Sequence, residues 1–314
     1  MGAQIIQRYG TAIAGALLVL FFLLFAPNFA SPANLINVLK DTSFLAILSL
    51  GFALAFTTGE LDLSVADIAS LAAVIAGWLV YKNYDPLLAV AAALALGALL
   101  GGFNGFVVTV LRVPSLIATL GTAAIARGLA FMITQGVAFV GRWPTSFTGL
   151  ARGTTFGISN LVIWLFAVVA LAYVLLAWTR TGAHMIATGE ADEAARLAGI
   201  ATRRMKRLGL LLSGLLAGVT AVLLSANLSS AAPNMAGDYF LYAIAAVLLG
   251  MTMFEPGRPN VAGTVFAALV LKILGNGLIL MGASYYVQDM ALGAIIIGSV
   301  AFSASALKKA AFKI

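Results

Sequence analysis

The sequence has no cysteine, a single histidine (His184) and few charged residues, with 11 acidic and 18 basic side chains in 314 positions. The absence of cysteine excludes disulfides, thiolate metal sites and a cysteine nucleophile. One histidine cannot build a histidine metal cluster. Soluble proteins are about one quarter charged, whereas this chain is 9% charged. The composition therefore excludes a soluble enzyme, a nucleic-acid-binding protein and a disordered chain.

Hydrophobic side chains make up 62% of the sequence and are gathered in long runs. A helix needs about 17–25 apolar residues to cross roughly 30 Å of hydrocarbon. The runs therefore predict an all-α fold, a polytopic membrane helix bundle of about ten transmembrane helices in one domain over residues 1–314. The expected helices are Thr11–Ala26, Asp41–Thr57, Ser64–Tyr81, Pro86–Leu111, Ser115–Gln135, Ile158–Trp178, Leu208–Leu228, Tyr239–Phe254, Asn260–Met281 and Val287–Ser303. The second and third could form one interrupted unit, and the first is interpreted as a retained helix rather than a cleaved signal peptide.

The basic residues are unequally divided between the two sides of this bundle. If the N-terminus is cytoplasmic, the inner segments hold Arg8, Arg112, Arg180, Arg196, Arg203, Arg204, Lys206, Arg207, Arg258, Lys308, Lys309 and Lys313, against Lys40, Lys82, Arg142 and Arg152 outside. The positive-inside rule therefore predicts that both termini face the cytoplasm. Arg127 and Lys272 lie within expected spans. We expect Arg127 to snorkel to an interface, and Lys272 to face an acidic partner or water.

The longest charged stretch, residues 180–207, lies between the sixth and seventh expected helices. Within it, Glu190–Gly199 reads as a short helix, because acids open it, Arg196 closes it and Gly199 supplies a left-handed stop. A pair between Asp192 and Arg196 is expected along this helix. So short a helix is unstable alone in water. It must therefore dock, either on the chain's own cytoplasmic surface or in a groove of a partner protein.

Glu60, Asp62 and Ser64 lie together in the break between the second and third expected helices. The break is either a polar cytoplasmic turn or an interrupted helix near mid-depth, of the kind that transporters use to build binding sites. Asn104, Thr119 and Asn276 can bond neighbouring helices or line a wet pathway. Glycines at every fourth residue, Gly97, Gly101 and Gly105 with Gly214 and Gly218, predict close packing inside one bundle.

A series of short motifs resembles the ribose/galactose permease family of ATP-binding cassette (ABC) importers. The motifs are Leu61–Val65 (LDLSV), Asn104-Gly105, Val113–Gly121 (VPSLIATLG), Ala187–Ile200 (ATGEADEAARLAGI), Ser213–Gly218 (SGLLAG), Ala243–Val247 (AIAAV) and Asn276–Leu278 (NGL). The stretch Ala187–Ile200 is similar to the family's coupling segment, which sits in the ATP-binding subunit. Residues 237–242 depart from the family pattern, since Phe240 and Tyr242 stand where it often has acids.

The resemblance implies a type II importer permease of a bacterial inner membrane that works by alternating access. The implied partners are a second permease copy or a paralogue, two ATP-binding cassette subunits, and a periplasmic or lipid-anchored solute-binding protein. No cofactor is expected on this chain, because ATP and magnesium would be held by the cassettes and no lysine follows a glycine as the Walker A motif requires. The expected coupling residues are Gly189, Glu190, Glu193, Ala194, Ala195, Arg196, Leu197 and Gly199. The expected substrate-pathway residues are Glu60, Asp62, Ser64, Asn104, Thr119, Tyr239, Tyr242 and Asn276.

The expected function is transport of a monosaccharide or a related small polar solute, without enzymatic activity in this subunit. A nucleoside or amino-acid permease of the same superfamily would share the fold and differ in its solute. An ion-coupled secondary transporter would instead use Glu60, Asp62 and Lys272 as proton or ion sites. Co-purification with an ATPase subunit favours the importer, whereas uptake driven by a proton gradient alone favours the secondary transporter.

Overall fold

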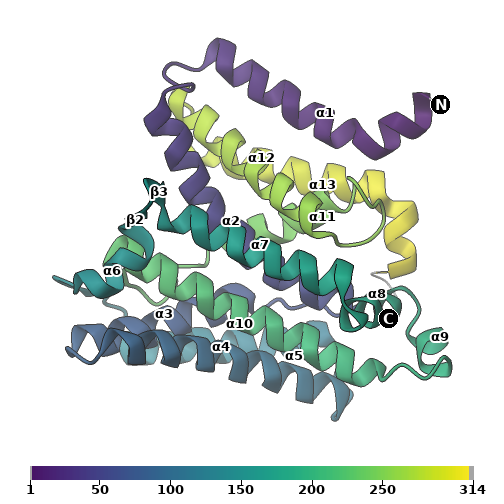
Figure 1. Ribbon diagram of the computed structural model, residues 1–314, viewed down its shortest axis with the longest axis horizontal. Helices are drawn as coiled ribbons and strands as arrows, with labels where there is room; N and C mark the ends of the chain where they lie inside the picture. Colours follow the sequence, from purple (N-terminus) through teal and green to yellow (C-terminus); the bar gives the residue numbers. More distant parts are fainter. Residues whose placement is uncertain (1, 311–314) are drawn as a thin grey trace.

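The computed structural model describes residues 2–310, which are mostly helical (Figure 1). The helices are α1 (Gly2–Phe25), α2 (Pro32–Thr57), α3 (Val65–Tyr81), α4 (Pro86–Thr109), α5 (Ser115–Thr134), α6 (Thr145–Arg152), α7 (Asn160–Trp178), α8 (Arg180–Glu190), α9 (Asp192–Leu197), α10 (Thr202–Leu228), α11 (Tyr239–Gly250), α12 (Val261–Leu280) and α13 (Tyr285–Ala310). The strands are β1 (Phe139–Val140), β2 (Thr154–Thr155), β3 (Ile158–Ser159) and β4 (Ser230–Ala231), and they form the antiparallel pairs β1–β4 and β2–β3.

Local capping signals fix where several of the long helices begin. Ser31 accepts a hydrogen bond from the Asn34 amide at the start of α2, and Asp85 accepts one from the Leu87 amide at the start of α4. In both cases proline follows the cap, where its missing N–H costs nothing and its fixed φ suits the first helical turn. Asn260 caps α12 in the same way through the Gly263 amide. The breaks between apolar runs are therefore encoded by their own residues.

Every expected membrane helix has a counterpart in the structure, with different ends in several cases. The clearest difference is α2, which begins at Pro32 rather than Asp41. In the part of the chain that the structure describes, α2, α4, α5, α7, α10 and α12 are long and apolar enough to cross a membrane. The apolar stretches of α1, α3, α11 and α13 are shorter. An all-α membrane bundle is thus confirmed, whereas the count of ten crossings stays a prediction.

The helix α10 lies at the centre of the bundle and packs along α2, α3 and α4. The seam between α4 and α10 is lined by glycine. A Cβ atom on Gly97 would overlap the carbonyl oxygen of Gly214, and one on Gly101 would overlap that of Leu210. The glycines at every fourth residue therefore bring the two backbones into contact, as their spacing predicts.

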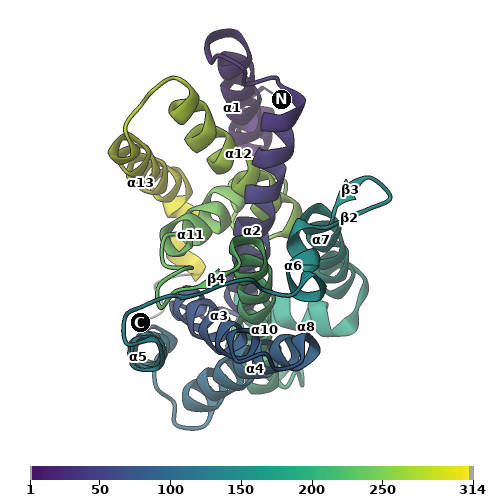
Figure 2. The same cartoon turned by 90° about the vertical axis from the view of Figure 1, so that its left-hand side faces the viewer.

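Two parts of the chain share one pattern, in which a long helix is followed by a non-helical segment and a short helix. In the first, α2 leads through residues 58–64 into α3; in the second, α10 leads through residues 229–238 into α11. The second segment reaches the first unit, since the Ala236 amide donates to Ser70 Oγ of α3 at 3.1 Å. Figure 2 shows α3 and α11 flanked by α5 and α13 on one side of the molecule. Interrupted helices of this kind are typical of transporter cores.

The loops gather at two opposite ends of the bundle (Figure 1). One end carries α8 and α9, together with the start of α1 and the end of α13. The other end carries α6 and the strands β2 and β3. We call the first of these the α8–α9 end.

Candidate functional site

A lysine at the α8–α9 end joins two segments that the sequence analysis treats separately. Lys206 lies near the start of α10, and its Nζ is 2.9 Å from Glu60 Oε1 and 2.9 Å from Asp192 Oδ2. The side chains of Lys206 and Glu60 are 22% and 9% exposed, whereas that of Asp192 is 49% exposed. The start of α10 therefore ties α9 to the segment that follows α2. Sequence reasoning missed this role of Lys206, because its partners are distant in the chain.

A backbone contact joins the same two regions. A Cβ atom on Gly189, near the end of α8, would overlap the carbonyl oxygen of Thr57 and would lie 3.1 Å from the Gly59 amide nitrogen. Gly59 itself has φ +84°, a left-handed conformation that favours glycine. The end of α8 therefore rests directly on the turn that closes α2.

The expected single helix Glu190–Gly199 is wrong in its start. Glu190 is the last residue of α8, and the extended residue Ala191 (φ −156°) interrupts the helix before α9 begins at Asp192. The charge pairs also differ, since Glu190 pairs with Arg258 at 3.1 Å and Arg196 lies 3.6 Å from Glu193. Asp192 is drawn instead to Lys206, because that ammonium group is partly buried beside it. The left-handed stop is confirmed, with Gly199 at φ +85°.

The helix α9 buries one side against its own chain and leaves the other exposed. Ala195 is 6% exposed, whereas Leu197 is 81% exposed. Glu193, Ala194, Arg196 and Gly199 are exposed as well. The role of these residues in binding an ATPase stays a prediction.

Four of the expected pathway residues lie in a buried hydrogen-bonded network. Ser64 donates to Asp62 Oδ1 through both its amide and its hydroxyl group, and accepts from Asn104 Nδ2 at 2.9 Å. Thr122 of α5 donates to Asn104 Oδ1 at 2.6 Å. Thr119 accepts from the Leu63 amide at 3.1 Å and donates to the Leu61 carbonyl at 3.2 Å. These hydrogen bonds attach the non-helical segment 58–64 to α4 and α5. The role of the four residues in a solute pathway stays a prediction.

The other expected pathway residues lie elsewhere. Asn276 of α12 exchanges two hydrogen bonds of 2.9 Å with Asn34 of α2, so it joins two helices. Lys272 lies over the rings of Tyr239 and Tyr242, with Nζ 4.7 Å and 5.6 Å from their centroids. The carboxylates of Asp41 and Asp238 are also electrostatic neighbours of Lys272, so the acidic company expected for this lysine is present beside the two aromatic faces.

Arg127 makes a two-point ion pair that the sequence reasoning did not expect. Its Nε and Nη2 atoms donate to the two carboxylate oxygens of Asp67 in α3, at 2.9 and 3.0 Å. The Asp67 side chain is 8% exposed, while that of Arg127 is 58% exposed. Asp67 could have been found, because it is an acid inside one expected span and Arg127 is a base inside another.

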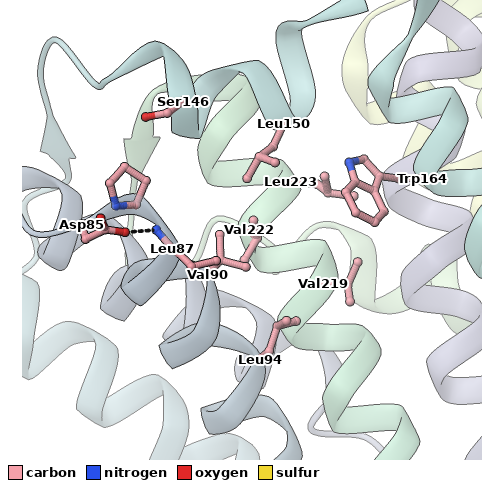
Figure 3. A pocket seen from close by; sticks show the side chains of 11 residues that line it. Asp85, Leu87, Val90, Leu94, Ser146, Leu150, Trp164, Val219, Val222 and Leu223 are labelled. Carbon is pink, nitrogen blue, oxygen red and sulfur yellow. Dashed lines mark hydrogen bonds between the residues drawn. The ribbon is translucent and has the colours of Figure 1, made fainter. Parts of the chain in front are cut away.

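Two cavities of about 420 Å³ each open on the described part of the chain. The first, between α4, α6, α7 and α10, is lined by Val90, Leu94, Leu150, Trp164, Val219, Val222 and Leu223 (Figure 3). Its acid, Asp85, is engaged by the Leu87 amide at 2.7 Å, the dashed line in Figure 3. Such a lining offers little to a hydroxyl-rich solute. The second cavity lies beside Asp67 and Arg127, and its lining mixes charged and polar side chains with apolar ones.

Comparisons with known proteins agree that the chain resembles transport permeases. The profile of a family described as branched-chain amino acid transport system / permease component matches residues 34–300. The ribose import permease protein RbsC of Escherichia coli (strain K12) is 38% identical over 295 residues, covering 91% of this chain and 90% of the relative. The RbsC of Bacillus subtilis (strain 168) is 32% identical over 297 residues, covering 94% and 92%. The L-arabinose transport system permease protein AraH of Escherichia coli (strain K12) is 32% identical over 300 residues, covering 95% and 91%.

One solved structure has the same fold. It is an ABC transporter assigned to the metal-chelate type, in an inward-facing conformation. Its chain is 12% identical to this one, with a TM-score of 0.50, and the match covers 97% of this chain and 99% of that one. At this identity the likeness bears on the fold alone.

Proposed function

The chain belongs to the family of permease components of ABC importers, and from this premise we propose that it carries a monosaccharide or a related small polar solute across the bacterial inner membrane. The relatives named for ribose and L-arabinose support a sugar. A second permease copy or a paralogue would complete the pathway. Two cassette subunits would hydrolyse ATP, and a periplasmic or lipid-anchored binding protein would deliver the solute.

The membrane topology forms part of the proposal: about ten crossings with both termini in the cytoplasm. Two features support it. The start of α1 and the end of α13 both lie at the α8–α9 end of the bundle (Figure 1). Lys206 and Arg258 are held at that end as well, through their ion pairs with the residues of α8 and α9. A positively charged end that carries both termini fits the cytoplasmic side.

The observation that carries the proposed function is the geometry of α9. Its exposed face, with Glu193, Arg196 and Leu197, projects from the bundle, while Asp192 and the preceding α8 are fastened to the core. A cassette that closes on ATP would push this face, and Lys206 would pass the displacement to the segment after α2. Alternating access then follows as a reorientation of the bundle around the solute.

The test reverses the charges on the exposed face of α9. We expect Glu193→Lys with Arg196→Glu to abolish solute-stimulated ATP hydrolysis in the reconstituted complex while the subunit still inserts into membranes. The matched control is Arg142→Glu, which changes an exposed base outside the α8–α9 segment and should leave stimulation intact. Normal stimulation of the double variant would refute the coupling role.

An amino-acid solute is the second candidate, because the matching family is described by branched-chain amino acid transport. The fold and the coupling surface would be the same. A thermal-shift screen of the cognate binding protein separates the two, since only its solute raises the melting temperature. Stabilisation by amino acids but not by sugars would overturn the sugar assignment.

A further inference from the structure

Arg127 is placed where a charge is costly. It lies in the middle of α5, a helix long and apolar enough to cross a membrane, and 58% of its side chain is exposed on the single chain. A charge in contact with lipid at this depth is strongly unfavourable, so intramembrane bases face protein or water. Its face of α5 therefore borders an aqueous space or a second protein surface rather than lipid.

The second cavity of about 420 Å³, whose lining holds both charged and apolar side chains, opens on this same face. Four elements build it: the non-helical segment 58–64, α3, α5, and the junction between residues 232–238 and α11. Its characteristic residues are Asp67, Arg127, Phe131, Asn234, Asp238 and Phe240. Two of these elements include the non-helical segments of the bundle, where transporters place solute sites.

We propose that this cavity is a contact site for an uncharged polyhydroxylated solute during its passage, with the Asp67–Arg127 pair as its recognition element. The inference rests on the proposed function and adds to it a location and a chemical class. None of the residues that the sequence analysis assigned to the pathway lines this cavity.

The ion pair leaves hydrogen-bonding capacity of both kinds. A guanidinium group has five N–H donors, and Arg127 uses two of them on Asp67, which leaves three. A carboxylate has about four acceptor positions, of which Asp67 uses two in the pair. Neighbouring hydroxyl groups of a sugar present donors and acceptors side by side. The pair matches that pattern without having to break.

The charge and the apolar surface of the cavity restrict the chemical class of the solute further. Asp67 and Arg127 neutralise each other, and Asp238 adds one negative charge to the lining. A carboxylated or phosphorylated solute would meet that charge, and it would also have to displace Asp67 from a two-point contact with Arg127. Phe131 and Phe240 supply apolar faces for the carbon side of a sugar ring. The lining therefore favours a neutral polyol over an anion.

The first test asks whether the cavity is wet. Because the chain contains no cysteine, a single cysteine substitution is a unique label site. We expect Leu120→Cys, at a cavity-lining position that is 48% exposed, to react with a membrane-impermeant thiol reagent in the assembled complex. The control is Ile125→Cys, since Ile125 is 58% exposed on a different face of the same helix, and we expect no labelling there. Absence of labelling at the cavity position would overturn the proposal.

The second test measures uptake of radiolabelled D-ribose and L-arabinose by proteoliposomes that contain the whole complex. We expect Asp67→Asn with Arg127→Gln, which removes both charges and leaves a neutral amide at each position, to raise the KM for uptake at least tenfold. Binding-protein-stimulated ATP hydrolysis should stay within twofold of the wild type. The control is Arg152→Gln, because Arg152 bonds the Asn227 carbonyl away from the cavity.

The possible results distinguish a failure of the cavity proposal from a failure of the proposed sugar function. An unchanged KM in the double variant would overturn the cavity assignment and leave the importer intact. A rise in KM with preserved ATP hydrolysis supports the site, since a loss of structure would lower ATP hydrolysis as well. Failure of the wild-type complex to take up either sugar in the presence of ATP would refute the proposed sugar function, and the cavity proposal with it.

Discussion

Replacing Lys206 by methionine removes the only charge that balances Glu60 in the described part of the chain. Lys206 Nζ lies 2.9 Å from both Glu60 and Asp192, and the Glu60 side chain is 9% exposed. Methionine keeps the length and packing of the lysine stem. The change therefore tests the charge rather than the volume.

The size of the effect follows from burial. Removing one partner of a fully buried ion pair costs about 3–5 kcal/mol, because the remaining charge is left without compensation. Lys206 retains 22% exposure, so water reaches the site and the expected loss from Glu60 is about 2–3 kcal/mol. The contact with Asp192, which is half exposed, adds less than about 1 kcal/mol.

Chemical unfolding of the purified subunit in detergent, followed by tryptophan fluorescence, measures this loss. The double variant Lys206→Met with Glu60→Gln should recover most of it, because a neutral amide needs no counter-charge. The control Lys82→Met, at an exposed position, should change the free energy of unfolding by less than about 0.5 kcal/mol. A double variant no more stable than Lys206→Met alone would show that Glu60 does not depend on this lysine.

Two further predictions concern the seam and the pH response. Gly214→Ala should lower the free energy of unfolding by about 1–3 kcal/mol, because its Cβ would overlap the Gly97 carbonyl oxygen. Gly102→Ala, whose Cβ meets only Leu211 Cδ1 at 3.9 Å, should be tolerated in the same unfolding assay. Burial acts to raise the pKa of Asp192, but contacts with Thr202 and Lys206 outweigh it and hold that pKa below its ordinary 3.8. Its stabilisation is therefore complete above the unfolded pKa and lost as pH falls through the lowered one. The melting temperatures of wild type and Asp192→Asn should differ near pH 7 and converge as pH falls through the lowered pKa. A difference that persists at low pH would contradict this reasoning.

The helices could be predicted from the sequence because their signals are local. Long apolar runs mark α4, α7 and α12, and a Ser-Pro or Asp-Pro pair marks the starts of α2 and α4. The early start of α2 is not predicted, because polar residues such as Asn34 and Lys40 interrupt the apolar pattern there. The local signal for this start is the N-cap Ser31 followed by Pro32. The helix α8 was missed because its residues, RTGAHMIATGE, form no apolar run.

The contacts of the candidate site required the structure. Lys206 and Glu60 belong to different helical units, and no local pattern pairs them. Asn104 was correctly recognised as a residue able to bond a neighbouring helix, yet its partners, Ser64 and Thr122, come from elements on either side of it in the chain. Charge inside apolar runs is the exception. Asp67 and Arg127 are opposite charges in two expected spans, and the cost of an unpaired charge in hydrocarbon is reason enough to pair them.

The non-helical segment 58–64 connects the two halves of the proposed mechanism. At one end it is held by Gly189 and Lys206, and so by the helices that carry the exposed face of α9. At the other end its amides and carbonyls bond Ser115 and Thr119 of α5. Residue 64 leads directly into α3, whose first turn bears Asp67. Since α3 and α5 supply the two members of the Asp67–Arg127 pair, a displacement of α9 cannot shift this segment without acting on both. Its buried hydrogen bonds would therefore act beyond stability, by making the segment a stiff link between the proposed coupling surface on α9 and the proposed solute cavity.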